Sequence, residues 1–184
     1  ENAEGLSDIF AKVGRISFLI TSLVLCGFIL FGQEFISLWA GNDFSEAYYV
    51  ALIVMIPFTV DIIQNIGLTI LQVINKYSFR GIMYLSIAII NIIATFFMAK
   101  YWGMIGAATA TAISMIVGNC IIMNVYYKKV AKLNVGKFWL EILKMLPGII
   151  LSLCAGYAIR FIKLPNVWVN LFVHITLFVV IFLF

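Results

Sequence analysis

Six polar side chains follow one another closely within the otherwise apolar residues 55–76. They are Asp61, Gln64, Asn65, Thr69, Gln72 and Asn75. At about 100° per residue they fall within one sector roughly 140° wide, so a continuous helix would carry them as a single polar stripe. Polar side chains in apolar surroundings must contact protein, water or a ligand. The stripe is therefore the first place to look for function.

Asp61 has the strongest chemical consequence in this stripe. Counting from the outer end of its predicted helix at about 1.5 Å per residue puts Asp61 roughly 20 Å deep in a membrane, inside the hydrocarbon layer. An unpaired carboxylate there costs at least about 2.5–3.5 kcal/mol, so we expect Asp61 to be paired, protonated or in contact with water. It serves either as a hydrogen bond between helices or as a cavity residue in a transport path, such as a proton or cation site.

The amide side chains around Asp61 suit the wall of a polar cavity for a hydroxyl-rich ligand, and each suits a hydrogen bond between helices equally well. The candidates are Gln64, Asn65, Gln72 and Asn75 on the same helix, with Asn91 and Asn119 on the next two helices as the facing wall. Pro57 lies four residues before Asp61, so a kink there would turn the stripe toward a cavity.

The composition is that of an integral membrane protein. Hydrophobic residues make up 64% of the chain, charged residues 11%, and the mean hydropathy is +1.12, whereas soluble domains are about one quarter charged. The apolar runs are long enough for helices of about 20 residues and lack the alternation of barrel strands. We therefore predict an all-α polytopic bundle with six spans, at about residues 16–38, 47–75, 79–99, 104–127, 139–162 and 167 to beyond 184.

The predicted organisation has four parts. Residues 1–15 combine charges with apolar residues at helical spacing, which predicts an amphipathic helix at the cytoplasmic interface. Four spans follow over residues 16–127, then a basic cytoplasmic loop over 128–138, then two more spans over 139–184 with the last one truncated. Because the chain begins without Met and stops within an apolar run, we expect a piece of a longer protein.

The distribution of Lys and Arg predicts the orientation in the cytoplasmic (inner) membrane, since basic residues in short loops stay in the cytoplasm. With the amino-terminal flank inside, nine basic residues lie on the cytoplasmic side: Lys12, Arg15, Lys76, Arg80, Lys128, Lys129, Lys132, Lys137 and Lys144. Only Lys100, Arg160 and Lys163 lie on the other side. This asymmetry favours a cytoplasmic amino-terminal flank.

Small residues at a spacing of about four predict a face for close helix packing. They are Gly103, Gly106, Ala110, Ser114 and Gly118. Near the predicted external face, Arg160 has two interpretations, contact with an anionic headgroup or extension to the membrane interface.

Signatures of catalysis are missing from the sequence. Cys26, Cys120 and Cys154 are not spaced as metal ligands or as a disulfide framework, and His174 has no carboxylate or second ligand at metal spacing. Nucleotide-binding loops and nucleophile elbows are also missing. We therefore expect a transporter rather than an enzyme, with no cofactor, no metal and no nucleic-acid partner.

One long segment resembles a known family. It reads LQVINKYSFRGIMYLSIAIINIIATFFMAKYWGMIGAATATAIS and carries Gln72, Asn75, Asn91 and the run 103–111, and the upstream GQEFISLWAGNDFSEAYYVALIVM has the same character. Both resemble the polysaccharide and O-antigen flippases of the Wzx type, most specifically over residues 16–129. Their superfamily also includes multidrug and toxin extruders and peptidoglycan-precursor flippases.

The resemblance implies that the six spans are the ninth to fourteenth of a two-lobed, MATE-like transporter. It implies movement of an oligosaccharide linked to polyprenyl pyrophosphate from the cytoplasmic to the outer leaflet by alternating access, with membrane lipid and other polysaccharide-assembly proteins as partners. Such flippases use a cationic central cavity. This chain departs from that pattern because its deepest charge is the acidic Asp61, so we expect the basic groups in the other lobe.

Three alternatives remain open on the sequence. The first is a drug or toxin extruder of the same superfamily, coupled to Na⁺ or H⁺ through Asp61. The second is a membrane-embedded acyl or glycosyl transferase, and the third is a scaffold for glycan assembly. Transport assays on Asp61→Asn separate the first alternative from the flippase.

Overall fold

The computed structural model describes residues 2–161 and 166–183, and these residues contain helices and turns but no strand. The elements are α1 (Asn2–Trp39), the 3-10 helix η1 (Asn42–Phe44), α2 (Glu46–Ile63), α3 (Asn65–Val73), α4 (Ser78–Met115), the π-helix η2 (Ile116–Met123), α5 (Asn124–Lys129), α6 (Val135–Leu143), α7 (Leu146–Ile159) and α8 (Val167–Leu183). The all-α prediction is confirmed.

Four stretches are long and apolar enough to cross a membrane: Glu4–Trp39, Asn42–Val73, Ser78–Lys129 and Val135–Ile159. The apolar helix α8 has 17 residues and is shorter than these. A helical, membrane-compatible bundle is therefore present, while the predicted number of six spans is not confirmed. The difference arises mainly in the stretch Ser78–Lys129, which has 52 residues and was predicted as two spans.

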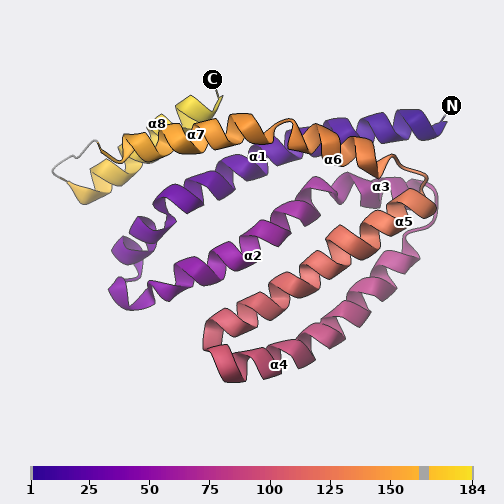
Figure 1. The fold of residues 1–184 in the computed structure, drawn as a ribbon, viewed down its shortest axis with the longest axis horizontal. Helices are drawn as coiled ribbons and strands as arrows, with labels where there is room; N and C mark the ends of the chain where they lie inside the picture. The colour runs from indigo at the N-terminus through magenta and orange to yellow at the C-terminus, as the bar shows by residue number, and fades with distance from the viewer. Residues whose placement is uncertain (1, 162–165, 184) are drawn as a thin grey trace.

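The chain reverses direction within this stretch at Gly103. Its backbone has φ 57° and ψ −138°, and Figure 1 shows the ribbon of α4 doubling back there. We call residues 78–102 the outward arm and residues 104–129 the return arm. A Cβ at Gly103 would meet no atom within 4 Å. The predicted packing role of Gly103 is therefore wrong, and this glycine makes the turn.

Gly103→Ala is expected to destabilise the protein by about 2 kcal/mol, because side chains rarely adopt this backbone conformation. The thermal unfolding midpoint of the detergent-solubilised protein measures the effect. Gly81→Ala is the control, since Gly81 is helical and also has no atom within 4 Å of an added Cβ. That control should be neutral or stabilising by up to about 1 kcal/mol. Equal destabilisation of both variants would contradict the assignment.

The predicted interfacial helix over residues 1–15 is not a separate element. From Asn2 it is continuous with the first span in α1. Phe10 is fully buried and stacks on Phe138 of α6, with ring centroids 4.3 Å apart. Apolar spacing alone does not distinguish a helix on the membrane surface from one that packs on protein, and here the partner is α6.

The fifth predicted span, residues 139–162, is also interrupted. Helix α6 ends at Leu143 and α7 begins at Leu146, with Pro147 in its first turn. Proline has no N–H to donate, so it is favoured in the first turn of a helix, where the N–H groups have no partner within the helix. Residue 162 lies outside the described part of the chain.

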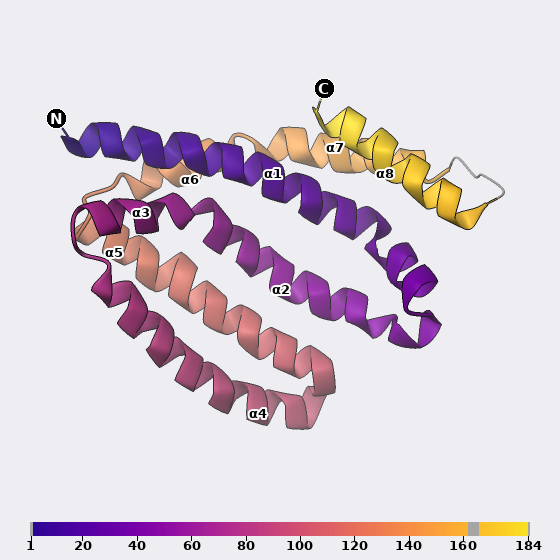
Figure 2. The ribbon, with the colours of Figure 1, turned by 180° about the vertical axis from the view of Figure 1, so that it is seen from behind.

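The long helices lie side by side with their ends at two sides of the molecule (Figures 1 and 2). Helix α1 contacts α2, α6 and α8, and α2 contacts α4.

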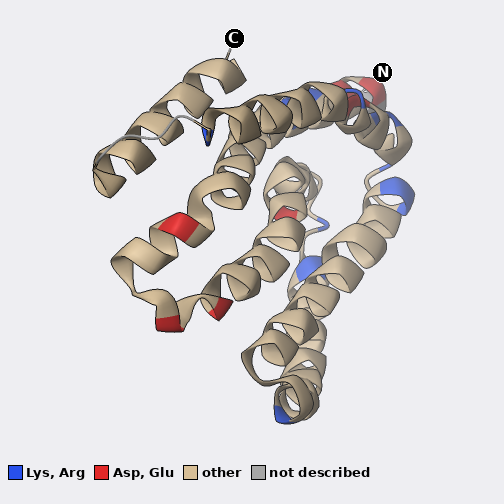
Figure 3. Cartoon of the chain, turned by 60° about the vertical axis from the view of Figure 1, so that its left-hand side comes forward, with Lys and Arg blue, Asp and Glu red and all other residues tan. Residues whose placement is uncertain are grey.

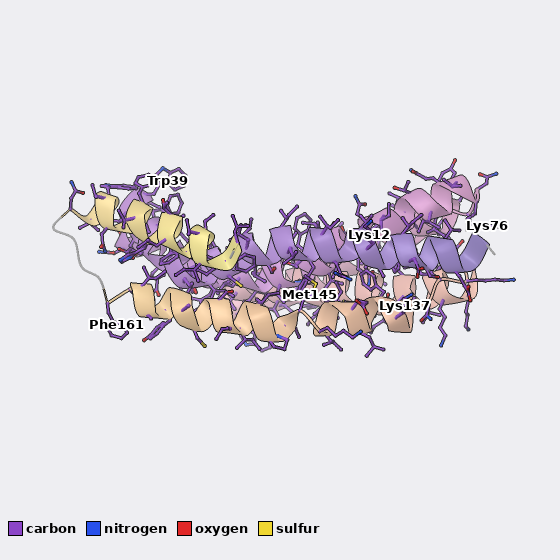
Figure 4. The ribbon with its side chains drawn as sticks, turned by 90° about the horizontal axis from the view of Figure 1, so that it is seen from above. Lys12, Trp39, Lys76, Lys137, Met145 and Phe161 are labelled. Carbon is purple, nitrogen blue, oxygen red and sulfur yellow. The ribbon has the colours of Figure 1, made fainter. Side chains whose placement is uncertain are left out.

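Figure 4 shows Lys12, Lys76 and Lys137 toward one end of the bundle, and Trp39 and Phe161 toward the other. We call the first the basic end. Figure 3 shows acidic positions at the turn between α1 and α2, far from the basic end.

Candidate polar site between α2 and α4

The polar stripe is divided in the structure because the helix breaks at Gln64, whose backbone has φ −93° and ψ 0°. Asp61 ends up partly buried and Gln64 is 3% exposed. Asn65, Thr69, Gln72 and Asn75 are exposed. The sequence prediction treated α2 and α3 as one helix, whereas the structure has two helices whose polar residues differ in exposure. The prediction of one continuous polar face is therefore wrong.

Asp61 forms an ion pair with Arg80, which lies in the first turn of α4. Arg80 Nη2 is 3.0 Å from Asp61 Oδ1. The Arg80 side chain is 9% exposed and that of Asp61 26%. The sequence counted Arg80 among the charges of a loop, whereas the structure buries it against α2. Asp61 is therefore not an isolated acidic charge, and the expectation that basic groups lie only elsewhere is corrected.

Tyr84 connects this pair to the return arm. Its hydroxyl oxygen accepts a hydrogen bond from Arg80 Nη2 at 2.8 Å and lies 2.9 Å from both Asp61 Oδ1 and Asn119 Oδ1. A phenol has one proton, so Tyr84 donates to one of these two oxygens at a time. The spacing of four residues places Tyr84 and Arg80 on the same face of α4. The guanidinium carbon is also 5.1 Å from the centre of the Tyr84 ring.

Arg80 keeps an unused donor. Its Nη1 atom is buried and has no hydrogen-bond partner among the described residues. A buried N–H group without a partner loses its bonds to water and gains nothing in return. An added acceptor, such as a phosphate oxygen, would remove that cost.

A cavity of about 170 Å³ adjoins this network, between α2 and the two arms. Asp61, Asn91 and Asn119, all singled out in the sequence, line it together with Tyr84. The small-residue row also contributes, through Ser114 and Gly118, and the remaining lining residues are Ile87, Ala88, Thr111 and Met115. Asn91 and Asn119, which were predicted as the facing wall, therefore line the same cavity as Asp61.

Asn91 is a contact between helices as well as a cavity residue. Its Oδ1 accepts a hydrogen bond from Ser114 Oγ at 3.1 Å, which joins the two arms. Its Nδ2 lies 3.5 Å from Thr111 Oγ1. Ser114 Oγ also lies 2.9 Å from the carbonyl oxygen of Ala110, so its single proton is donated to one of these two acceptors at a time.

Gln64 is not among the residues that line this cavity, and its side chain forms a contact between helices. Its Nε2 donates to Asn124 Oδ1 at 2.9 Å, and Asn124 Nδ2 donates to the Cys120 carbonyl at 2.7 Å. Asn119 and Cys120 belong to the π-helix η2. π-Helical turns rotate the side chains that follow and occur often at functional sites. Here η2 precedes Asn124 and contains Asn119.

The other predicted residues lie away from the cavity. Asn65 and Gln72 are exposed on α3, and Asn75 adopts a left-handed turn with φ 56°. Arg160 is exposed at the carboxyl end of α7. The packing residues Gly106, Ala110 and Gly118 are buried, and side-chain atoms of the outward arm lie where a Cβ on Gly118 would point.

Three residues of the site were not predicted as site residues: Arg80, Tyr84 and Asn124. The sequence carried no signal for Arg80, because Asp61 lies in the middle of the predicted span 47–75 and Arg80 lies at the start of the next span. In the structure α2 ends at Ile63, two residues after Asp61, and Asp61 contacts Arg80. The spacing of four residues from Arg80 then places Tyr84 on the same face of α4.

Tyr84→Phe is expected to lower the free energy of unfolding by about 1–2 kcal/mol, because the Asn119 amide and Arg80 each lose a partner while the ring remains. Thermal unfolding in detergent measures the loss. Tyr77→Phe provides the control, since Tyr77 is exposed and makes no side-chain hydrogen bond within the described residues. A loss of the same size in Tyr77→Phe would contradict the role of the Tyr84 hydroxyl.

Comparisons of the chain with models of known protein families, with curated proteins and with solved structures find no match.

Proposed function

We propose that this chain is part of a flippase that moves an oligosaccharide linked to polyprenyl pyrophosphate across the cytoplasmic membrane by alternating access, for the assembly of polysaccharide, O-antigen or capsule. The family resemblance supports the class of substrate. The single observation that carries the proposal is a cavity lined by hydroxyl and amide groups, whose lining residues Asp61 and Tyr84 bind the buried Arg80. The residues that line this cavity supply hydrogen-bond donors and acceptors for a hydroxylated, anionic headgroup.

The physical requirements of this transport agree with the site. A charged, hydroxylated headgroup needs a shielded polar path through the hydrocarbon layer, while its lipid tail stays in the membrane. The free donor of Arg80 suits a phosphate oxygen, since guanidinium groups bind phosphate well. The cavity of about 170 Å³ is small for a whole oligosaccharide. In our proposal the second lobe, implied by the resemblance, provides the remaining wall.

Topology and location form part of the proposal. We propose six spans, in which the outward and return arms cross the membrane separately and α8 is the last span. The reversal at Gly103 and the four long apolar stretches support this arrangement. The common position of Lys12, Lys76 and Lys137 at the basic end (Figure 4) supports a cytoplasmic amino-terminal flank. Lys163, counted on the opposite side, lies outside the described residues.

The ion pair favours the flippase over the ion-coupled extruder. A carboxylate that binds Na⁺ or a proton during transport must be available, and Asp61 already accepts from Arg80 at 3.0 Å. The guanidinium of Arg80 already occupies Asp61 Oδ1, so a coupling ion must displace it before it can bind. The extruder thus needs a step that separates the pair, which the flippase does not.

The test is reconstitution of the full-length protein in liposomes with a fluorescent lipid-linked oligosaccharide. Movement between leaflets is read as loss of protection from a quencher that cannot cross the membrane. Asn91→Ala should slow movement about tenfold, from the loss of one or two hydrogen bonds. Asn65→Ala, an exposed amide outside the cavity, is the matched control. Lack of movement in the wild type, or drug export that Asp61→Asn abolishes, would refute the proposal.

A further inference from the structure

A second and larger cavity lies between α1 and α6, toward the basic end. Its volume is about 520 Å³. Three cationic side chains line it, from Lys12, Arg15 and Lys137, with the carboxylates of Asp8 and Glu141 between them. The polar site between α2 and α4 shares none of these residues. We call this the basic cavity.

The carboxylates do not neutralise the basic cavity. Asp8 pairs with Lys137 at 2.6 Å. Glu141 is shared between Arg15 at 3.2 Å and Lys144 at 2.7 Å. Lys12 forms no ion pair within the described part of the chain. The three cationic side chains that line the cavity therefore face two carboxylates, which leaves a net charge of one positive.

The basic cavity continues into an apolar groove. The groove has a volume of about 430 Å³ between α1, α7 and α8, and both cavities are lined by Leu19 and Met145. Of the described residues that line the groove, only Ser152 has a polar side chain, and its hydroxyl donates to the Gly148 carbonyl at 3.0 Å. The groove therefore offers hydrocarbon contact and no free polar group.

The order of these features along the bundle matches the shape of a membrane lipid. Figure 4 shows Lys12 and Lys137 toward the basic end and Met145 nearer the middle, on the way to Phe161 at the other end. Charge thus lies toward the end of the bundle, and the apolar groove runs from it toward the centre. Clusters of Lys and Arg at a membrane surface attract anionic headgroups.

We propose that the basic cavity and the apolar groove together bind one anionic glycerophospholipid, with its phosphate among Lys12, Arg15 and Lys137 and an acyl chain along the groove. A soluble anion would use the cations but would leave the groove empty. An uncharged lipid would use the groove but would leave the net positive charge unpaired. This inference does not rest on the proposed function, because its test measures lipid binding and not transport.

The experiment is native mass spectrometry of the full-length protein taken from bilayers of phosphatidylcholine with phosphatidylglycerol as the minor component. We expect wild-type protein to retain one phosphatidylglycerol in preference to phosphatidylcholine. Lys12→Gln should weaken that retention about fivefold, as expected for one cation near a membrane surface. Lys76→Gln is the matched control, since Lys76 also lies toward the basic end but outside the cavity. Equal weakening by both variants would overturn the site in favour of general surface charge.

A second pair of variants tests the groove. Gly148→Phe places a ring in the groove, where an added Cβ meets no atom within 4 Å, and should weaken retention of phosphatidylglycerol as much as Lys12→Gln does. Ile150→Phe adds a ring on an exposed face of α7 outside the lining and should leave retention unchanged. Unchanged retention in Gly148→Phe would overturn the proposal. So would displacement of the lipid by glycerol 3-phosphate, which has the same anionic group without a chain.

Discussion

Arg80→Met is expected to lower the free energy of unfolding by about 3 kcal/mol, the largest effect of any single change in the polar site. Removal of one partner from a buried ion pair leaves the other charge uncompensated and costs about 3–5 kcal/mol. Because the Asp61 side chain is 26% exposed, we expect a loss of stability at the lower end of this range. Methionine keeps most of the volume and the apolar contacts of the arginine stem, so the loss reports mainly on charge.

A second substitution separates charge from packing. In the Arg80→Met background, Asp61→Asn removes the stranded carboxylate and should restore most of the lost stability, measured by thermal unfolding in detergent. If Arg80 acts only through packing, the double variant will be no more stable than Arg80→Met. Lys76→Met is the control, because Lys76 is an exposed cation close in sequence and should change stability by no more than about 0.5 kcal/mol.

Transport by the double variant then tests the proposed function. The polar site of the double variant would have no cationic donor, since the free Nη1 of Arg80 is lost. We expect a protein of near-normal stability that moves the lipid-linked oligosaccharide at least about tenfold more slowly than the wild type. Normal transport would show that Arg80 only holds α2 and α4 together.

The sequence predicted that Asp61 needs compensation, because the cost of a bare carboxylate at membrane depth depends only on its position. It did not predict the source of that compensation. Arg80 is 19 residues away and follows an apparent loop, where counting charges by loop assigns it to the membrane surface. A long arginine in the first turn of a helix can extend along the neighbouring helix, and only the packing of α4 on α2 decides that direction.

Helix continuity was the other weak point of the sequence prediction. The polar face over residues 61–75 required one helix, yet the backbone breaks at Gln64 although no proline or glycine occupies that position. Propensity is a weak constraint compared with tertiary contacts. Here Gln64 donates to Asn124 and Ile63 is buried. The reversal at Gly103, by contrast, had a local signal in the glycine itself, although the sequence interpreted it as part of a packing row.

Two glycines of the predicted small-residue row, Gly106 and Gly118, lie close to atoms of the outward arm, and Gly106 carries the second large expected effect. Gly106→Ala should destabilise the protein by about 3 kcal/mol, the upper end for an overpacked core position. An added Cβ at Gly106 would collide with the carbonyl oxygen of Met98, and main-chain atoms cannot move without shifting the whole outward arm. Gly148→Ala is the matched control, since the same added methyl meets no atom within 4 Å there. Thermal unfolding in detergent compares the two variants.

Gly118→Ala provides the contrast that tests this mechanism. Its added Cβ would lie 2.7 Å from Ile87 Cδ1, the end of a flexible side chain. Truncation by Ile87→Val removes that methyl group, so it should rescue Gly118→Ala. The corresponding truncation Met98→Ala should not rescue Gly106→Ala, because the obstacle is main chain. Rescue of both variants would mean that the two arms approach through side chains alone. Rescue of Gly118→Ala only would place the closest approach of the two backbones at Gly106, near the turn, with the polar cavity further along where the arms leave room for Asn91 and Asn119.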